Sequence, residues 1–163
     1  IIFNGKKHIR MTTNKTSLAV AALRNGTVID HIPADQLFKC VKILGVENLS
    51  NQLTIGNNLM SHKLGAKGII KIADVTFPEK VLNRVALVAP TAVVNIIRDY
   101  HVVEKRPVVL PQTVVGIVRC SNPKCITNNE PMATRFEVVD PETRTIRCHY
   151  CNHTTTGAKA DII

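Results

Sequence analysis

Four cysteines near the end of the sequence form two short pairs. Cys120 and Cys125 have four residues between them, and Cys148 and Cys151 have two. Each pair can place two sulfur atoms on one ion, and a hairpin in the 22 residues between the pairs can bring them together. This spacing is typical of a tetrahedral four-thiolate site. It predicts one structural Zn2+, because four sulfur ligands leave no open position for a catalytic water.

Other interpretations of the cysteines require conditions that the sequence does not favour. Two disulfides would need an oxidising compartment, and Ile1–Phe3 is too short an apolar run for a secretory signal. A redox pair would not need the second pair of thiols. His149 and His153 could replace a thiolate, but we expect both on the surface. Cys40 lies in a helical pattern, which predicts a buried free thiol.

The positive charge of the chain is concentrated in its first part. The 163 residues, enough for one ordinary domain or two small ones, carry a net charge of +9. Residues 1–118 contain 15 Lys/Arg and 7 Asp/Glu, which gives +8, whereas residues 119–163 contain 6 and 5, which gives +1. The excess favours an anionic partner such as phosphate, or else a plain solvated basic surface. The near-neutral metal module, the 4% aromatic content and the absence of tryptophan argue against a nucleic-acid binder.

The pattern of apolar residues predicts the elements that would position these groups. Residues 27–32 form a β-branched run after the turn signal Asn25-Gly26, and residues 34–44 have a helical period that Gly45 ends. A capping-box pattern from Thr76 to Glu79 predicts the start of a second helix. The remaining predictions for the first part are strands at 52–55, 69–72 and 91–103, a polar loop at 57–68 and an extended connector at 105–111. The metal module should contain strands at 114–118, 134–139 and 144–148.

The predicted order is strand, helix, strand, strand, helix, strand. It indicates an α+β fold, a ferredoxin-like antiparallel sheet with two helices on one face, followed by a small β-rich zinc-binding domain. We expect residues 1–14 to be a disordered or cloning-derived extension, residues 15–111 to form the first domain and residues 112–163 the second. No apolar run approaches the roughly 20 residues that a membrane-spanning helix needs.

Several short motifs resemble one known family. They are Gly-Thr-Val-Ile-Asp-His-Ile-Pro at 26–33, Leu-Thr-Ile-Gly at 53–56, Lys-Arg-Pro at 105–107 and the four cysteines with their spacing. Together they resemble the regulatory chain of aspartate carbamoyltransferase, from about residue 17 to the end. The resemblance implies a non-catalytic, cytoplasmic subunit that acts in pyrimidine biosynthesis. Its first domain would bind the allosteric nucleotides ATP and CTP, with UTP as a further candidate.

The resemblance also implies partners. The first domain would form a homodimer with a second regulatory chain, and the zinc-binding domain would contact a separate catalytic chain. The result would be a larger hetero-oligomer of catalytic trimers and regulatory dimers, with neither nucleic acid nor membrane as a partner. The implied nucleotide-binding residues are Val20, Ala22, Leu23, Val28, Asp30, His31, Lys67, Lys71, Asn95, Ile97, Tyr100, Val102 and Lys105. Ala21 stands where some relatives carry an acidic residue, so the contact to the sugar is left open.

The chemistry of these residues suits a nucleoside triphosphate. Lys67 and Lys71 are four residues apart, so in one strand both would point to the same sheet face. Lys105 and His31 would add further positive groups, and the apolar members would be walls for the base. Taken alone, a lysine in such a position is more often a solvated strand-end charge than a ligand, and the apolar walls can be read as plain core. The sequence contains no Walker-type loop or catalytic trio, so we expect a ligand that biases a conformational equilibrium and is not hydrolysed.

Overall fold

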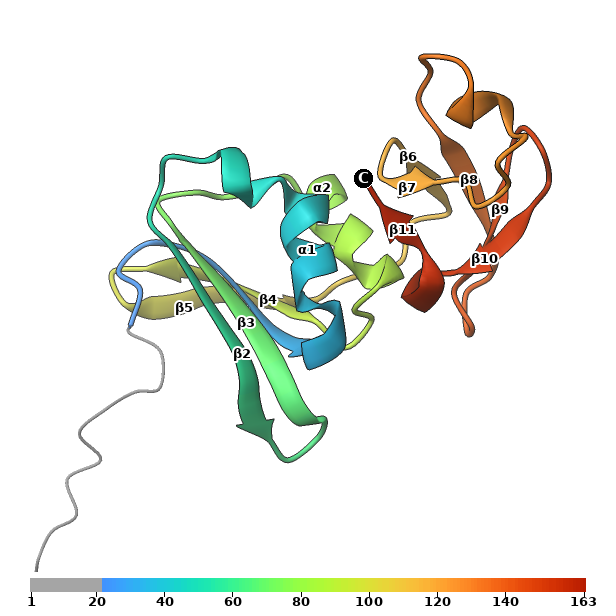
Figure 1. The fold of residues 1–163 in the computed structure, drawn as a ribbon. Helices are drawn as coiled ribbons and strands as arrows, with labels where there is room; N and C mark the ends of the chain where they lie inside the picture. The colour runs from blue at the N-terminus through green and yellow to red at the C-terminus, as the bar shows by residue number, and fades with distance from the viewer. Residues whose placement is uncertain (1–21) are drawn as a thin grey trace, which may run out of the picture.

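The computed structural model describes residues 22–163. The predictions for residues 1–14, for the start of the first domain and for Val20 lie outside the described residues. Two parts are visible, a sheet with two helices and a smaller β-rich module, and the C-terminus lies between them (Figure 1).

The first part contains strands β1 (Gly26–Pro33), β2 (Leu53–Ser61), β3 (Gly65–Ala73), β4 (Val93–Arg98) and β5 (His101–Pro107). Its helices are α1 (Leu37–Leu44) and α2 (Glu79–Arg84), with 3-10 turns η1 (Ala34–Gln36), η2 (Val46–Asn48) and η3 (Val85–Leu87).

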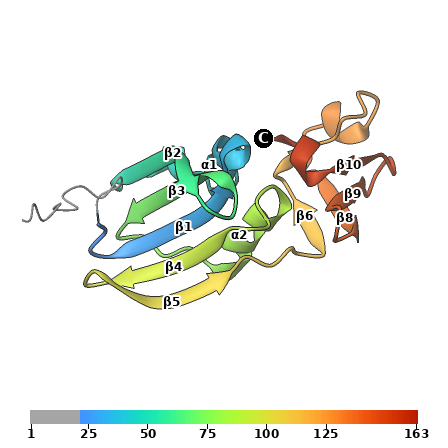
Figure 2. The ribbon, with the colours of Figure 1, turned by 90° about the horizontal axis from the view of Figure 1, so that it is seen from below.

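The five strands form one sheet in the order β2-β3-β1-β4-β5, as Figure 2 shows. Every neighbouring pair is antiparallel. The chain runs β1-α1-β2-β3-α2-β4, which confirms the predicted ferredoxin-like α+β arrangement, and β5 adds a further edge strand as a hairpin with β4. The segment predicted as a strand at 91–103 contains two strands, β4 and the start of β5, joined by a turn at Asp99 and Tyr100, both of which have positive φ angles.

The two faces of the sheet have different partners. Ile29, Ile70 and Val94 belong to the main core, together with Leu37 of α1 and Leu82 of α2. The opposite, open face carries only a small apolar cluster, formed by Val28, Ile69 and Ile97 with Leu23 and Leu59 against it. Successive residues of a strand point to opposite faces of the sheet. The residues of each strand therefore alternate between a face that the helices cover and a face that is available to a ligand.

The prediction of a polar loop at residues 57–68 is wrong, because this segment is most of a β-hairpin. β2 continues to Ser61 and β3 begins at Gly65. Polar residues are compatible with this hairpin because it lies at the edge of the sheet and because a bulge lies between Gly56 and Leu59. Asn57 in this bulge donates a side-chain hydrogen bond of 3.0 Å to the Ala34 carbonyl, which attaches the edge to the start of the first helical segment.

The predicted capping box at the second helix does not form. The N-cap residue is Pro78, and no side chain caps the helix. Glu79 is the first helical residue and lies 3.6 Å from Arg106 Nη1. By contrast, the first helix ends as predicted, since Gly45 follows it in a left-handed conformation with a φ of 61°. Cys40 is fully buried in this helix as a free thiol, and burial raises its pKa to about 12.

The metal module consists of short strands. They are β6 (Thr113–Val115), β7 (Val118–Arg119), β8 (Arg135–Asp140), β9 (Thr145–Cys148), β10 (Thr154–Thr156) and β11 (Asp161–Ile162), with 3-10 turns η4 (Ile126–Asn128) and η5 (Gly157–Lys159). One sheet has the order β10-β9-β8-β6 and the other pairs β11 with β7. The predicted single strand at 114–118 is wrong, because Gly116, with a φ of 70°, separates β6 from β7.

The two parts of the chain share a single continuous core. Ala160 and Ile162 of the metal module belong to the same buried cluster as Leu37. Lys39 Nζ on α1 donates a hydrogen bond of 2.6 Å to the Ala158 carbonyl, and Lys42 Nζ donates one of 3.3 Å to the Ile162 carbonyl. Among the described helices, none has the length and apolar character that crossing a membrane requires.

Candidate functional site

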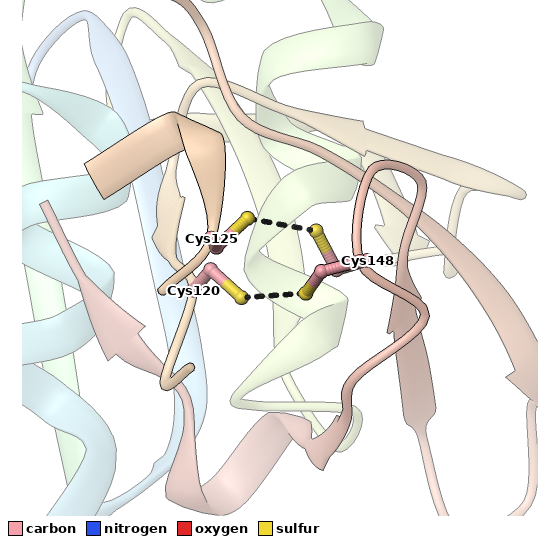
Figure 3. A group of neighbouring side chains, drawn as sticks. Cys120, Cys125 and Cys148 are labelled. Atoms are coloured by element: carbon pink, nitrogen blue, oxygen red, sulfur yellow. Dashed lines mark hydrogen bonds between the residues drawn. The ribbon is translucent and has the colours of Figure 1, made fainter. Parts of the chain in front are cut away.

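The four cysteines come together at one end of the metal module. Cys120 follows β7, Cys125 precedes η4, Cys148 is the last residue of β9, and Cys151 lies in the turn after it. Their sulfur atoms all lie within 4.8 Å of one another. The sulfur atoms of Cys120 and Cys151 are 3.6 Å apart. Those of Cys125 and Cys148, both labelled in Figure 3, are 3.7 Å apart. A tetrahedral ion with metal–sulfur bonds of about 2.3 Å separates its ligands by about 3.8 Å, so the donor set fits such an ion.

Hydrogen bonds from the turn after Cys125 hold the ligand loop in place. The Asn128 side-chain amide donates hydrogen bonds of 2.8 Å to the carbonyls of Cys120 and Asn122, and Asn129 donates one of 2.8 Å to the Cys125 carbonyl. Burial alone would raise the pKa of Cys125. Hydrogen bonds to Thr127 oppose this effect and lower the pKa to about 7, which favours the thiolate at Cys125. Burial instead raises the pKa of Cys120 to about 12 and also raises that of Cys148, so these two thiols depend on a bound cation to become thiolates.

The two histidines beside the second cysteine pair are surface residues, as predicted. His149 and His153 are both exposed. His149 Nδ1 lies 3.4 Å from Glu137 Oε1, so its ring is directed at a carboxylate on the neighbouring strand. Four thiols and no histidine therefore make up the metal-ligating group found in the described part of the chain.

A second group of residues lies on the open face of the sheet. Val28 of β1 is directly opposite Lys71 of β3 and Asn95 of β4, and Asn95 is opposite Lys105 of β5. Residues directly opposite one another in antiparallel strands share a face. The strand register therefore places Lys71, Val28, Asn95 and Lys105 in one row, which we call the cross-strand row, with a cation toward each end.

Three members of the cross-strand row, Val28, Lys71 and Asn95, line a cavity of about 280 Å³, which we call the first chamber. The chamber contains eight of the thirteen residues that the sequence resemblance implies. They are Ala22, Leu23, Val28, Lys71, Asn95, Ile97, Tyr100 and Val102. Ile69 also lines it and was not among the predicted residues, although its place between Lys67 and Lys71 in one strand could have indicated it. Val20 lies outside the described residues.

Three of the remaining predicted residues form a polar cluster next to this chamber. Lys67 Nζ lies 2.8 Å from Asp30 Oδ1, and the His31 backbone N–H donates a hydrogen bond of 2.6 Å to the same carboxylate. Burial raises the pKa of Asp30, but these two hydrogen bonds outweigh that effect and hold it below its ordinary value. His31 has a φ of 58°, and its Nδ1 is buried without a hydrogen-bond partner. Asp30 thus neutralises part of the charge that Lys67 would offer to a ligand.

The two lysines of the cross-strand row have different surroundings, and of the two only Lys71 lines the first chamber. Partial burial lowers the pKa of Lys71, and the nearby carboxylate of Asp30 opposes this shift. Lys105 is exposed on the edge strand β5. A larger cavity, of about 620 Å³, lies elsewhere, beside Cys120 and Thr134 of the metal module, and none of the predicted nucleotide residues lines it.

Comparisons with known proteins agree with the division into a sheet part and a metal module. Residues 18–109 match the family described as aspartate carbamoyltransferase regulatory chain, allosteric domain, and residues 112–161 match the metal binding domain of the same chain. A regulatory chain from Parabacteroides distasonis is 58% identical over 149 residues, which are 91% of this chain and 96% of the relative. One from Porphyromonas gingivalis is 56% identical, covering 91% and 99%. One from Pyrococcus horikoshii is 48% identical over 139 residues, covering 84% and 91%.

Proposed function

The chain belongs to the family of aspartate carbamoyltransferase regulatory chains, which are non-catalytic subunits, and we propose that it binds ATP and CTP on the open sheet face. One observation carries this proposal. Eight residues implied by the family resemblance, from four separate segments of the chain, surround one chamber that combines apolar walls with Lys71 and Asn95. An apolar cavity with a few convergent polar groups is the usual form of a small-molecule site.

The cations around the first chamber suggest how the nucleotide lies. The triphosphate would extend toward Lys105, with His31 and Lys67 in reach from the neighbouring polar cluster. The base would then lie at the other end of the chamber, against Leu23 and Tyr100. UTP, which carries the same phosphates, is a further candidate ligand.

Binding alone does not regulate a partner, since an effector must bind two conformational states with different affinities. The continuous core between the sheet and the metal module offers a physical path for such a difference. We place the allosteric domain at residues 15–111 and the metal-binding domain at residues 112–163. Bound nucleotide would change the balance between two arrangements of the assembly, and the metal module would carry that change to the catalytic chain.

The metal module is proposed to hold one structural Zn2+ and to contact the catalytic chain. The four thiols suit a closed tetrahedral site, and such sites supply folding free energy to small modules. Two regulatory chains would pair through their sheet domains. Regulatory dimers would then connect catalytic trimers into a larger assembly.

The proposal is tested by mixing the full chain with aspartate carbamoyltransferase catalytic chain. We expect a larger particle whose carbamoyl transfer to aspartate responds to ATP and CTP. Removal of the metal should release catalytic subunits that stay active and no longer respond. Sedimentation and activity measured on the same sample decide the matter. A nucleotide response that persists after the chains separate would show that the regulatory role is misassigned.

A further inference from the structure

A second chamber adjoins the first and is assigned to no ligand by the family resemblance. It has a volume of about 320 Å³ and shares Ala22, Leu23, Lys71 and Tyr100 with the first chamber. Its other walls are polar for the most part, and include Gln52 and Thr54 at the edge of the sheet. The two chambers therefore meet at the end of the first chamber where the proposed function places the base.

The strand register places Thr54 on the same face as the proposed ligand. Thr54 of β2 is directly opposite Lys71 of β3, so it extends the cross-strand row by one strand, at the end away from Lys105. Thr54 is partly buried, whereas Gln52, two residues earlier, is exposed. Thr54 in the edge strand and Gln52 just before that strand thus both border the second chamber.

Backbone hydrogen bonds fix the walls of the second chamber. The Ala73 N–H donates a hydrogen bond of 2.9 Å to the Gln52 carbonyl, and the Asp74 N–H donates one of 3.0 Å to the Asn25 carbonyl. The Tyr100 N–H donates a further one of 2.9 Å to the Arg24 carbonyl. These contacts join four separate segments around the cavity, so its size is set by the fold and a ligand has to fit it.

We propose that the second chamber accommodates the additional ring of a purine base, and that Thr54 and Gln52 determine selectivity between ATP and CTP. This inference rests on the proposed function. With the triphosphate directed toward Lys105, a pyrimidine base reaches the junction at Leu23 and Lys71. A purine has two fused rings and extends farther from the sugar, so its far edge enters the space beside Thr54.

The polar lining suits the far edge of adenine. The Thr54 hydroxyl and the Gln52 amide can each donate and accept hydrogen bonds, and a purine edge presents ring nitrogens and exocyclic groups. Cytosine, which stops at the junction, would leave this chamber to water. The two nucleotides therefore use the same phosphate and sugar contacts and differ in their use of the second chamber.

The experiment places a larger side chain in the second chamber at each of two positions, Thr54 and Gln52. Calorimetric titration of the full, metal-loaded chain with ATP and with CTP would compare wild type, Thr54→Met and Gln52→Phe. We expect each larger side chain to weaken ATP binding by roughly tenfold or more and to change CTP binding less than twofold, because steric exclusion acts on the ring that enters the chamber. Thr54→Ser, which keeps the hydroxyl and adds no volume, should leave the ratio of the two affinities unchanged.

Gln52 is exposed before the start of β2, so Gln52→Phe tests the inference without disturbing the core, and circular dichroism with metal content checks the fold of each variant. Equal weakening of ATP and CTP, or no change in either, would overturn the role of the second chamber. If the wild-type chain bound neither nucleotide, the proposed function itself would be overturned, so the two failures are distinguishable.

Discussion

Gly157 of the metal module packs directly against Leu87 of the sheet domain. A Cβ atom placed on Gly157 would overlap the Leu87 carbonyl oxygen and lie 2.9 Å from the carbonyl carbon. Gly157 is buried, and its own N–H donates a hydrogen bond of 3.0 Å to the Arg144 carbonyl. Arg144 in turn donates a side-chain hydrogen bond of 3.4 Å to the Val88 carbonyl. The two domains therefore meet here without room for a side chain.

Gly157→Ala should force the two domains apart at this contact. Leu87 presents its backbone, which cannot rotate away, so we expect the free energy of unfolding to fall by about 1–3 kcal/mol, as in other overpacked sites. Metal content and nucleotide affinity should be unchanged, because neither site includes Gly157. The nucleotide effect on a bound catalytic chain should decrease, since the connection between the domains is altered. Urea unfolding and activity assays measure these quantities.

Lys159→Ala is the matched control for Gly157→Ala, because Lys159 is exposed in the same 3-10 turn. It should change neither the free energy of unfolding nor the nucleotide effect appreciably. A Gly157→Ala protein that retained wild-type stability and a full nucleotide effect would show that the Leu87 contact is not part of the coupling.

Cys148→Ser should release the metal and unfold the chain from about residue 112 onward. A module of roughly 50 residues has too little core to fold alone, so it depends on the metal for folding free energy. Cys148 is fully buried and its sulfur lies 3.7 Å from that of Cys125, so its replacement removes one of the four grouped thiols. Metal analysis combined with circular dichroism measures both effects, and Cys151→Ser should behave alike.

Cys40→Ala separates loss of a thiol from loss of the metal site. Cys40 is buried in α1 and is not a member of the four-thiol group. Its replacement should reduce stability through lost packing, but should leave the metal content at one ion per chain. A folded, metal-loaded Cys120→Ser/Cys148→Ser double variant would contradict the four-thiolate assignment.

The Asp30–Lys67 ion pair should stabilise the fold in a manner that depends on pH. The pKa of Asp30 in the folded chain lies below its ordinary value of 3.8. A depressed pKa contributes stability that is fully present above 3.8 and is lost as the pH falls through the folded value. The difference in free energy of unfolding between wild type and Lys67→Met should therefore be largest near pH 7 and decrease below pH 3.8.

Lys63→Met is the control for this pH dependence, since Lys63 is exposed in the turn between β2 and β3. It removes the same charge without touching Asp30. A Lys67→Met difference that stayed constant between pH 7 and pH 3 would mean that the ion pair does not depress the Asp30 pKa.

Local signals in the sequence predicted much of the metal centre and the order of the strands. The four cysteines were identifiable because ligand spacing within each pair is a local property. The segment at 57–68 was mistaken for a loop because an edge hairpin exposes one side to solvent, and Asn57 and Asn58 lie in its bulge. Thr54 could not be placed beside Lys71 without the register of β2 against β3, which is a long-range relationship.

Lys105→Ala should weaken the binding of ATP and CTP alike. Lys105 is opposite Asn95 in the cross-strand row and is exposed, so its ammonium group can reach a phosphate from the edge of the first chamber. A charge-assisted hydrogen bond to phosphate contributes on the order of 1.5–3 kcal/mol, which corresponds to a loss of affinity of roughly tenfold or more.

Lys63→Ala is the control for Lys105→Ala. It removes an exposed lysine of the same charge from the far end of the β2–β3 hairpin, and should leave both affinities within twofold of wild type. Calorimetric titration at two salt concentrations distinguishes a direct contact from a general charge effect. Only a direct contact makes the Lys105→Ala protein bind nucleotide more weakly than the Lys63→Ala protein at both salt concentrations. Equal binding by the two variants would mean that the phosphates lie elsewhere on the open face.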